Sequence, residues 1–352
     1  MKKLLALVLA IVMVLSLCAC TKPGNPNTGD NSNNNSTGNN NSNNNGNGEN
    51  DEKDEKVTAS LLTKVVITNN YEDSKEIMTG VMEYDADYNV IGSKAYLDDK
   101  LYNELTFAKD PNRPLVEQYY DEDGNPGERA VYTYDEDGNQ LTHTSFNEDG
   151  EVDWKYVYTY DKDGNQLSKK SYSGDELEYE IVYTYDEHGN MLSETNEIGD
   201  WCNTFENTYK DGKLTQVKRY TDGTLSGCTQ YDGDGNEILS ISYDDEEESE
   251  RTESTYENGK LIKVVSYTYG DESYCGEYTY NEDGKLTQQL RKYSDEYVFK
   301  TINTYNDNGD LIGIVNYDNE KVVAEITLSY KTVTVSKEQA EGILNVQDML
   351  GI

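Results

Sequence analysis

The sequence predicts an all-β protein, a long antiparallel meander of tandem β-hairpins in one twisted or spiralling sheet. One phrase recurs almost unchanged, as VYTYDEDGNQL at 131–141, VYTYDKDGNQL at 157–167 and VYTYDEHGNML at 182–192. Aromatic residues before acidic turns recur about every 12 residues, which fits one strand plus one tight turn. Between turns, Tyr alternates with Val or Thr, as a pleated strand with two different faces requires.

The turns of the repeat carry a recognisable signature. EDGN, KDGN, KDGK and ENGK all place Gly third, as in a type I turn followed by a left-handed residue that forms a bulge. Looser turns, such as YSGDEL and YDDEEE, lie between these well-formed ones. Because alternate turns of a meander lie on opposite edges, we expect one regular edge, one variable edge and a repeating hairpin of about 25 residues.

The length of the meander predicts its curvature. The aromatic anchors imply about twenty strands, and open sheets seldom exceed ten strands without curling or splitting. Aliphatic residues are too sparse for a thick two-sheet core, so the 31 tyrosines should supply most of the buried area. We therefore expect strong twisting or spiral curvature of a single sheet.

The first residues read as a secretory signal. MKK supplies a positive start, and an apolar run follows from Leu4 to Leu17, too short for a spanning helix. LCAC at 17–20 resembles the lipobox of bacterial lipoproteins, which implies that Cys20 becomes a lipidated N-terminus. The alternative is ordinary secretion with a chance cysteine. The lipid on Cys20 would place the protein on the extracytoplasmic face of the bacterial cell membrane.

The chain then divides into segments of different composition. After the signal peptide at 1–19, residues 20–56 form an Asn-, Gly- and Ser-rich linker that cannot bury enough apolar surface to fold. The hairpin repeats occupy 57–335. Residues 336–352 predict a C-terminal helix, in which Ser336 and Gln339 form a capping box.

The charge of the chain restricts its partners. The formal net charge is −38. A field of that sign repels nucleic acid and anionic membrane surfaces, so we predict no nucleic-acid partner. The membrane contact is expected only through the lipid on Cys20, and no other cofactor is predicted.

The repeated phrase also resembles a known family. YTYDEDGNQL and its copies are similar to the YD repeats of the RHS family, in which Tyr-Asp is followed by two residues, Gly and a polar residue. The resemblance covers roughly residues 120–320 and implies hairpins that curl into a spiralling sheet. Larger members enclose a C-terminal toxin, but this chain is short and ends in a predicted helix, so encapsulation is not carried over.

Three cysteines, Cys202, Cys228 and Cys275, remain after the signal and Cys20. Each follows a variable-edge turn on strands of one direction. Cys202 and Cys228 should be two strands apart, about 9–10 Å, beyond disulfide reach. We predict that they are not paired in a monomer.

Catalytic and metal chemistry find little support. DEDGN resembles the opening of a calcium loop, but its Gly comes one ligand too soon, so turn chemistry is favoured over a calcium-binding repeat. His143 and His188 are the only histidines, and no catalytic motif is present. We predict a protein that is not an enzyme, with no catalytic residues and no metal site.

The tyrosine rows are the best candidate for binding. Six tyrosines should line one face in register: Tyr132, Tyr134, Tyr158, Tyr160, Tyr183 and Tyr185. Aromatic rows can stack on sugar rings or contact a protein partner. The alternative, favoured for most individual tyrosines, is that they pack on one another as the core of the sheet. The function predicted is a surface module that binds a polysaccharide or a protein, and the alternative is a spacer without a ligand.

Overall fold

The computed structural model describes residues 56–71, 74–107, 113–199, 201–293, 297–337 and 340. These residues form an all-β protein of 22 strands joined by short turns. In chain order the strands are β1 (Lys56–Asn70), β2 (Lys75–Tyr84), β3 (Val90–Leu97), β4 (Lys100–Phe107), β5 (Pro114–Tyr120), β6 (Pro126–Tyr134), β7 (Gln140–Phe146), β8 (Val152–Tyr160), β9 (Gln166–Ser173), β10 (Glu176–Tyr185), β11 (Met191–Ile198), β12 (Trp201–Lys210), β13 (Lys213–Thr221), β14 (Thr224–Tyr231), β15 (Glu237–Asp244), β16 (Glu247–Glu257), β17 (Lys260–Thr268), β18 (Asp271–Tyr280), β19 (Leu286–Lys292), β20 (Val298–Tyr305), β21 (Leu311–Asp318) and β22 (Lys321–Ser336).

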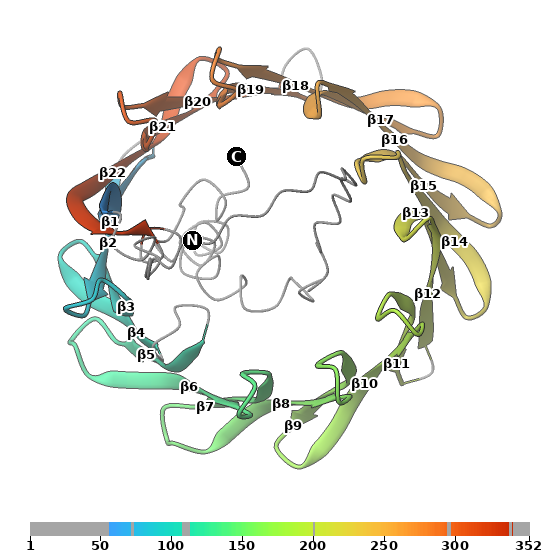
Figure 1. The fold of residues 1–352 in the computed structure, drawn as a ribbon, viewed down its shortest axis with the longest axis horizontal. Helices are drawn as coiled ribbons and strands as arrows, with labels where there is room; N and C mark the ends of the chain where they lie inside the picture. The colour runs from blue at the N-terminus through green and yellow to red at the C-terminus, as the bar shows by residue number, and fades with distance from the viewer. Residues whose placement is uncertain are drawn as a thin grey trace, which may run out of the picture.

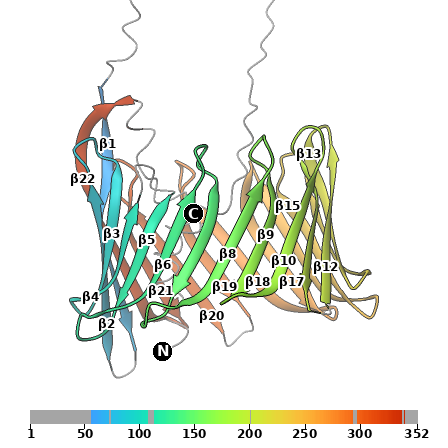
Figure 2. The ribbon, with the colours of Figure 1, turned by 90° about the horizontal axis from the view of Figure 1, so that it is seen from below.

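The strands form a closed barrel rather than an open spiral. Each strand pairs antiparallel with the next, and β22 returns to pair antiparallel with β1. The result is a ring of strands (Figure 1) that tilt relative to the axis of the ring (Figure 2). The predicted meander is confirmed, and the predicted open or spiralling shape is wrong.

The seam between β1 and β22 explains the closure. These are the two longest strands, with 15 and 16 residues, and they pair from Lys56 with Ser336 to Asn69 with Ala324. Leu61, Val333 and Val335 of these two strands form a small buried cluster of their own. Other apolar side chains of β1 and β22 belong to the main buried cluster of the protein, listed here in chain order: Leu62, Val65, Ile67, Met78, Met82, Val90, Leu105, Phe107, Leu311, Ile314, Ile326 and Leu328. Burial of apolar surface at the seam favours closure over two exposed sheet edges.

The turns alternate between two rims of the barrel. We call the rim with the turns after even-numbered strands the regular rim, and the rim with the turns after odd-numbered strands the variable rim. The regular rim holds the repeated turns at 135–139, 161–165 and 186–190, whereas the loose turns YSGDEL and YDDEEE follow β9 and β15 on the variable rim. The predicted division into a regular and a variable edge is confirmed in part, because the variable rim also carries two turns of the repeated type, at 121–125 after β5 and at 147–151 after β7.

The repeated turn is held by its first carboxylate. The Oδ1 atom of Asp135 accepts the backbone N–H of Asn139 at 2.8 Å, and its Oδ2 atom accepts the side-chain amide of Asn139 at 2.9 Å. Gly138 takes φ of 91°, which a residue with a Cβ rarely adopts. The hydrogen bond from the Asn139 side chain lowers the pKa of Asp135. Asp161, Asp186 and Asp232 repeat this pattern.

A row of tyrosine hydroxyls joins successive hairpins. Each ring lies near the regular rim, and its hydroxyl donates to a backbone carbonyl of the preceding strand, at 2.5–3.1 Å. These clamp tyrosines are Tyr84, Tyr134, Tyr160, Tyr185, Tyr209, Tyr280, Tyr305 and Tyr330. The tyrosine that precedes each acidic turn of the repeat therefore has a structural role, because its hydroxyl links neighbouring strands.

Removing one clamp should weaken the sheet measurably. In Tyr280→Phe the ring stays and the carbonyl of Leu261 loses its donor at 2.8 Å. We expect the free energy of unfolding to fall by about 1 kcal/mol, measured by urea titration. Tyr297→Phe, on an exposed ring, is the control and should be neutral. Equal effects of the two changes would contradict the clamp.

The predicted C-terminal helix at 336–352 needs a correction at its start. Ser336, predicted as its cap, is instead the last residue of β22 and pairs with Lys56. Beyond it only Lys337 and Ala340 are described, so the rest of this prediction lies outside the described residues, as do the signal peptide, Cys20 and nearly all of the linker. No helix in the described part of the chain is long and apolar enough to cross a membrane.

Candidate ligand-binding site on the tyrosine face

The sheet has two different faces. We call the tyrosine face the one that carries the six predicted tyrosines. Strand register places Tyr132, His143, Tyr156, Ser171 and Tyr179 side by side on this face. The residues of the main buried cluster also lie on it, as the pairs Ile67 with Met78 and Ile314 with Ile326 show. Because the concave side of a closed sheet crowds its side chains, we infer that the tyrosine face is the inner one.

The six predicted tyrosines are mostly committed to the sheet itself. The hydroxyls of Tyr134, Tyr160 and Tyr185 donate to the backbone carbonyls of the clamp. Tyr132 and Tyr158 are buried. Tyr183 is half-buried, and burial followed by the Glu194 carboxylate raises its pKa to about 12. The structure thus places all six on one face. Five of them are buried or bonded to the backbone, so they hold the sheet together rather than offer a free ring to a ligand.

An aromatic cluster continues from this row and is better placed for contact. The rings of Tyr132 and His143 stack with centroids 4.3 Å apart, and Trp154 meets His143 edge-on at 4.4 Å. Tyr156 lies 4.8 Å from Trp154 and 6.5 Å from Tyr179. We call these five residues the aromatic cluster. All but the first were outside the sequence prediction.

Charged groups border the aromatic cluster. The Nζ atom of Lys169 lies 4.2 Å from the centroid of the Tyr156 ring, a cation–π contact. Burial, and then Lys169, lowers the pKa of His143 to about 4, so the imidazole is neutral at pH 7. On the same face, burial raises the pKa of Glu194, and Lys169 offsets part of that effect. The cluster therefore combines uncharged rings with an amine and a carboxyl group at its border.

A buried carboxylate supports the cluster from the neighbouring strands. Glu117 on β5 accepts the hydroxyl of Tyr119 at 2.6 Å, the amide of Asn103 at 3.1 Å and the hydroxyl of Tyr132 at 3.4 Å. Burial, and then the charge of Glu117, raises the pKa of Tyr119. These bonds fix the position of Tyr132, the first ring in the series Tyr132, His143 and Trp154.

The same face carries polar atoms that have no protein partner. Three buried side-chain atoms among the described residues make no hydrogen bond: Oδ1 of Asn196, Nε of Arg291 and Oδ1 of Asn303. Register puts all three on the tyrosine face, with Asn196 opposite Ile181 and Arg291 opposite Gly276. Native interiors leave few such groups unpaired, so these atoms are available to bridging water or to a ligand.

Metal and thiol chemistry are weakly represented. The described residues contain no group of three or more His, Cys, Asp or Glu side chains that could hold a metal ion. Cys202 and Cys228 lie on β12 and β14, two strands apart as predicted, and with Cys275 they are free thiols. The turn carboxylates that suggested calcium instead accept N–H donors within their own turns.

Fold and site together define a closed β-meander repeat protein with an aromatic inner face. A family described as "Uncharacterised protein" has a model that matches residues 33–236, more than half of the chain, and the chain belongs to that family. A search of curated proteins gave no significant match.

Two solved structures illustrate the similarity to known folds. TcdB2-TccC3-TEV is 12% identical with a TM-score of 0.30, and the alignment covers 76% of this chain but only 17% of that one. A porin-like protein from Bacteroides uniformis is 11% identical with a TM-score of 0.27, and the alignment covers 77% of this chain and 96% of that one. Both TM-scores are below 0.5, so neither likeness defines the fold of this chain.

Proposed function

We propose that the protein is a non-catalytic, extracytoplasmic lipoprotein with YD-type repeats, anchored by lipid on Cys20, that binds a polysaccharide on its tyrosine face. The observation that carries the proposal is the aromatic cluster with Lys169 at its border. The C–H faces of a sugar ring stack on aromatic rings, while its hydroxyls bond to charged groups at the border. The cluster supplies both kinds of contact within a few ångströms.

The attachment of the chain is consistent with an anchored binder. β1 begins at Lys56 and β22 ends at Ser336, and both residues lie at the regular rim. The linker and the proposed lipid therefore join the barrel at one rim. The variable rim would face away from the membrane, and a ligand could approach the inner face from that side.

A polysaccharide suits this site better than a folded protein partner. The aromatic cluster lies on the face inferred to line the inside of the ring, which a flexible linear polymer can enter more readily than a folded protein domain can. About 22 strands spaced by about 4.8 Å give a circumference near 105 Å, so side chains alone do not fill the ring. The alternative, a spacer without a ligand, leaves the unpartnered polar atoms and the half-exposed rings of this face unused.

The two tryptophans of the chain provide a matched test. Trp154 belongs to the aromatic cluster, and Trp201 lies exposed on the variable rim. On a glycan array, the wild type should retain a polysaccharide, Trp154→Ala should weaken that binding roughly tenfold, as expected for a loss of about 1.4 kcal/mol, and Trp201→Ala should not. In Trp201→Ala, the fluorescence of Trp154 should change on addition of the ligand.

Two results would overturn the proposal. If the folded wild type retains no glycan on the array, the spacer function is favoured. If Trp154→Ala and Trp201→Ala bind alike, the ligand does not contact the aromatic cluster. Circular dichroism of each variant shows whether the sheet remains intact.

A further inference from the structure

The variable rim carries a group of exposed aromatic rings between β17 and β20. Tyr269 is 70% exposed at the tip of the β17–β18 turn, and Tyr293 and Tyr297 are 51% and 59% exposed at the neighbouring β19–β20 turn. Rings of this size are usually buried in part, because their burial stabilises the fold. Three of them at adjacent tips of one rim form an interaction surface rather than a core.

Tyr269 occupies a backbone position that does not favour tyrosine. Its φ is 49°, in the left-handed region, and it opens a two-residue turn completed by Gly270. At the same position of other variable-rim turns the chain has Asp98, Asp222 and Asn319, residues that tolerate this conformation. At 70% exposure the tyrosine ring gains little from burial there.

The rings connect with their surroundings on both sides. The hydroxyl of Tyr269 donates to Oδ2 of Asp244 at 3.4 Å, at the start of the β15–β16 turn. Tyr293 contacts Tyr274 with centroids 5.1 Å apart and Phe299 at 5.9 Å. The turns at β15–β16 and β17–β18, together with Tyr293 and Tyr297 at the ends of β19 and β20, thus form one stretch of rim. We call this stretch the rim patch, with Tyr269, Tyr293 and Tyr297 as its aromatic members.

The rim patch is strongly negative. Six exposed carboxylates lie in its turns or at the strand ends beside them: Asp244, Asp245, Glu246, Glu247, Asp271 and Glu272. Within the described part of the chain, no Lys or Arg is recorded in an ion pair with any of them. Negative charge beside exposed aromatic rings attracts cations, which bind to the faces of such rings.

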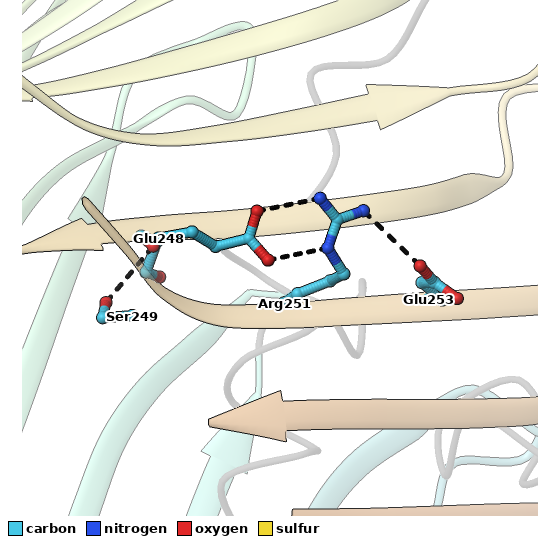
Figure 3. Close-up of polar contacts among 5 residues, drawn as sticks. Glu248, Ser249, Arg251 and Glu253 are labelled. Atoms are coloured by element: carbon cyan, nitrogen blue, oxygen red, sulfur yellow. Dashed lines mark hydrogen bonds and ion pairs between the residues drawn. The ribbon is translucent and has the colours of Figure 1, made fainter. Parts of the chain in front are cut away.

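The nearby cations are already committed to other carboxylates. Figure 3 shows the guanidinium of Arg251, which donates to both oxygens of Glu248 at 2.7 and 2.8 Å and to Glu253 at 3.4 Å. Lys292 pairs with Glu277 at 3.3 Å. Arg251 and Lys292 thus pair with Glu248, Glu253 and Glu277 rather than with the six carboxylates of the rim patch.

We propose that the rim patch binds a Lys- or Arg-rich segment of a partner protein. The carboxylates pair with its cations, and Tyr269 and Tyr297 stack on them. Adjacent turns of this rim are two strands apart, about 10 Å, which matches side chains three residues apart on one face of a polyproline II peptide, which has three residues per turn. β1 begins at the opposite rim, so the rim patch is not the rim at which the first strand starts. The inference does not depend on glycan binding at the tyrosine face.

Variants that remove tyrosine rings without altering the net charge distinguish binding at the rim patch from a general attraction of cations to an acidic protein. A fluorescent octalysine peptide is titrated with the full chain, and anisotropy is measured at low and moderate salt. The double variant Tyr269→Ser/Tyr297→Ser keeps the net charge, and we expect it to bind at least fivefold more weakly than the wild type. Tyr71→Ser, at an aromatic residue 44% exposed on the same rim but at the β1–β2 turn, should bind as the wild type does.

Two outcomes count against the inference. If the double variant and Tyr71→Ser bind octalysine equally, the attraction is general and the rim patch is no site. If chitosan oligomers of the same charge bind as tightly as octalysine, the patch recognises amines without a preference for peptide, and a protein partner is excluded. Trp154→Ala should leave octalysine binding unchanged, so a failure of the glycan proposal is distinguishable from a failure here.

Discussion

Replacing Leu311 with alanine should lower the free energy of unfolding by about 3 kcal/mol. Leu311 is 0% exposed and lies in the main buried cluster beside the seam. Its backbone carbonyl accepts the clamp hydroxyl of Tyr330 at 2.8 Å, and this bond is not altered by the change. The loss therefore reports the packing of the leucine side chain, and urea or thermal unfolding measures it.

The chain offers a matched control at an exposed leucine. Leu167 on β9 is 40% exposed, and Leu167→Ala should cost less than about 1 kcal/mol. If the two changes destabilise the protein equally, the seam contributes no special core and closure must have another cause. A greater loss for Leu311→Ala, together with an unchanged far-ultraviolet spectrum before unfolding, supports a closed barrel stabilised at its seam.

The hairpins could be predicted because each depends on residues close in sequence. The turn from Asp135 to Asn139 contains its own carboxylate cap and its own left-handed glycine, Gly138. The alternation of Tyr with Thr or Val fixes which face each side chain takes. Local chemistry of this kind repeats in many of the hairpins, and it indicated the meander and its turns.

Closure could not be predicted from the same signals, because it depends on residues far apart in sequence. Val57 pairs with Val335 and Ile67 with Ile326, and no local pattern shows that such strands will meet. Open and closed arrangements contain the same hairpins and differ by one strand pairing. The difference lies in the curvature summed over all strands and in the apolar seam.

The candidate site was predicted in part for a related reason. The repeated tyrosines could be recognised in the sequence because they recur at a fixed spacing. Such repetition indicates a structural role, and the clamp tyrosines and the buried Tyr132 and Tyr158 have that role. His143 and Trp154 occur outside the repeated phrase and meet only across β7 and β8. Pairing the strands on either side of the 147–151 turn in register would have found them.

Acidification should destabilise the protein through His143 before its carboxylates titrate. Burial, and then Lys169, lowers the pKa of His143 to about 4 in the folded state, whereas the usual value is near 6.5. The unfolded chain therefore takes up a proton below pH 6.5 that the folded chain refuses until about pH 4. Stability is fully present above pH 6.5, and we expect about 2 kcal/mol to be lost between pH 7 and 4.5.

The two histidines of the chain make this prediction specific. His143→Gln should remove that part of the pH dependence, whereas His188→Gln, in an exposed turn, should keep it. The turn aspartates, whose pKa values are lowered, lose their contribution mainly below this window, and Glu194, whose pKa is raised, acts in the opposite direction. Both effects are the same in the two variants, so they cancel in the comparison. Urea unfolding at pH 7 and at pH 4.5 measures how much free energy of unfolding each variant loses on acidification. Equal losses for the two variants would show that His143 is not buried against the rings of Tyr132 and Trp154.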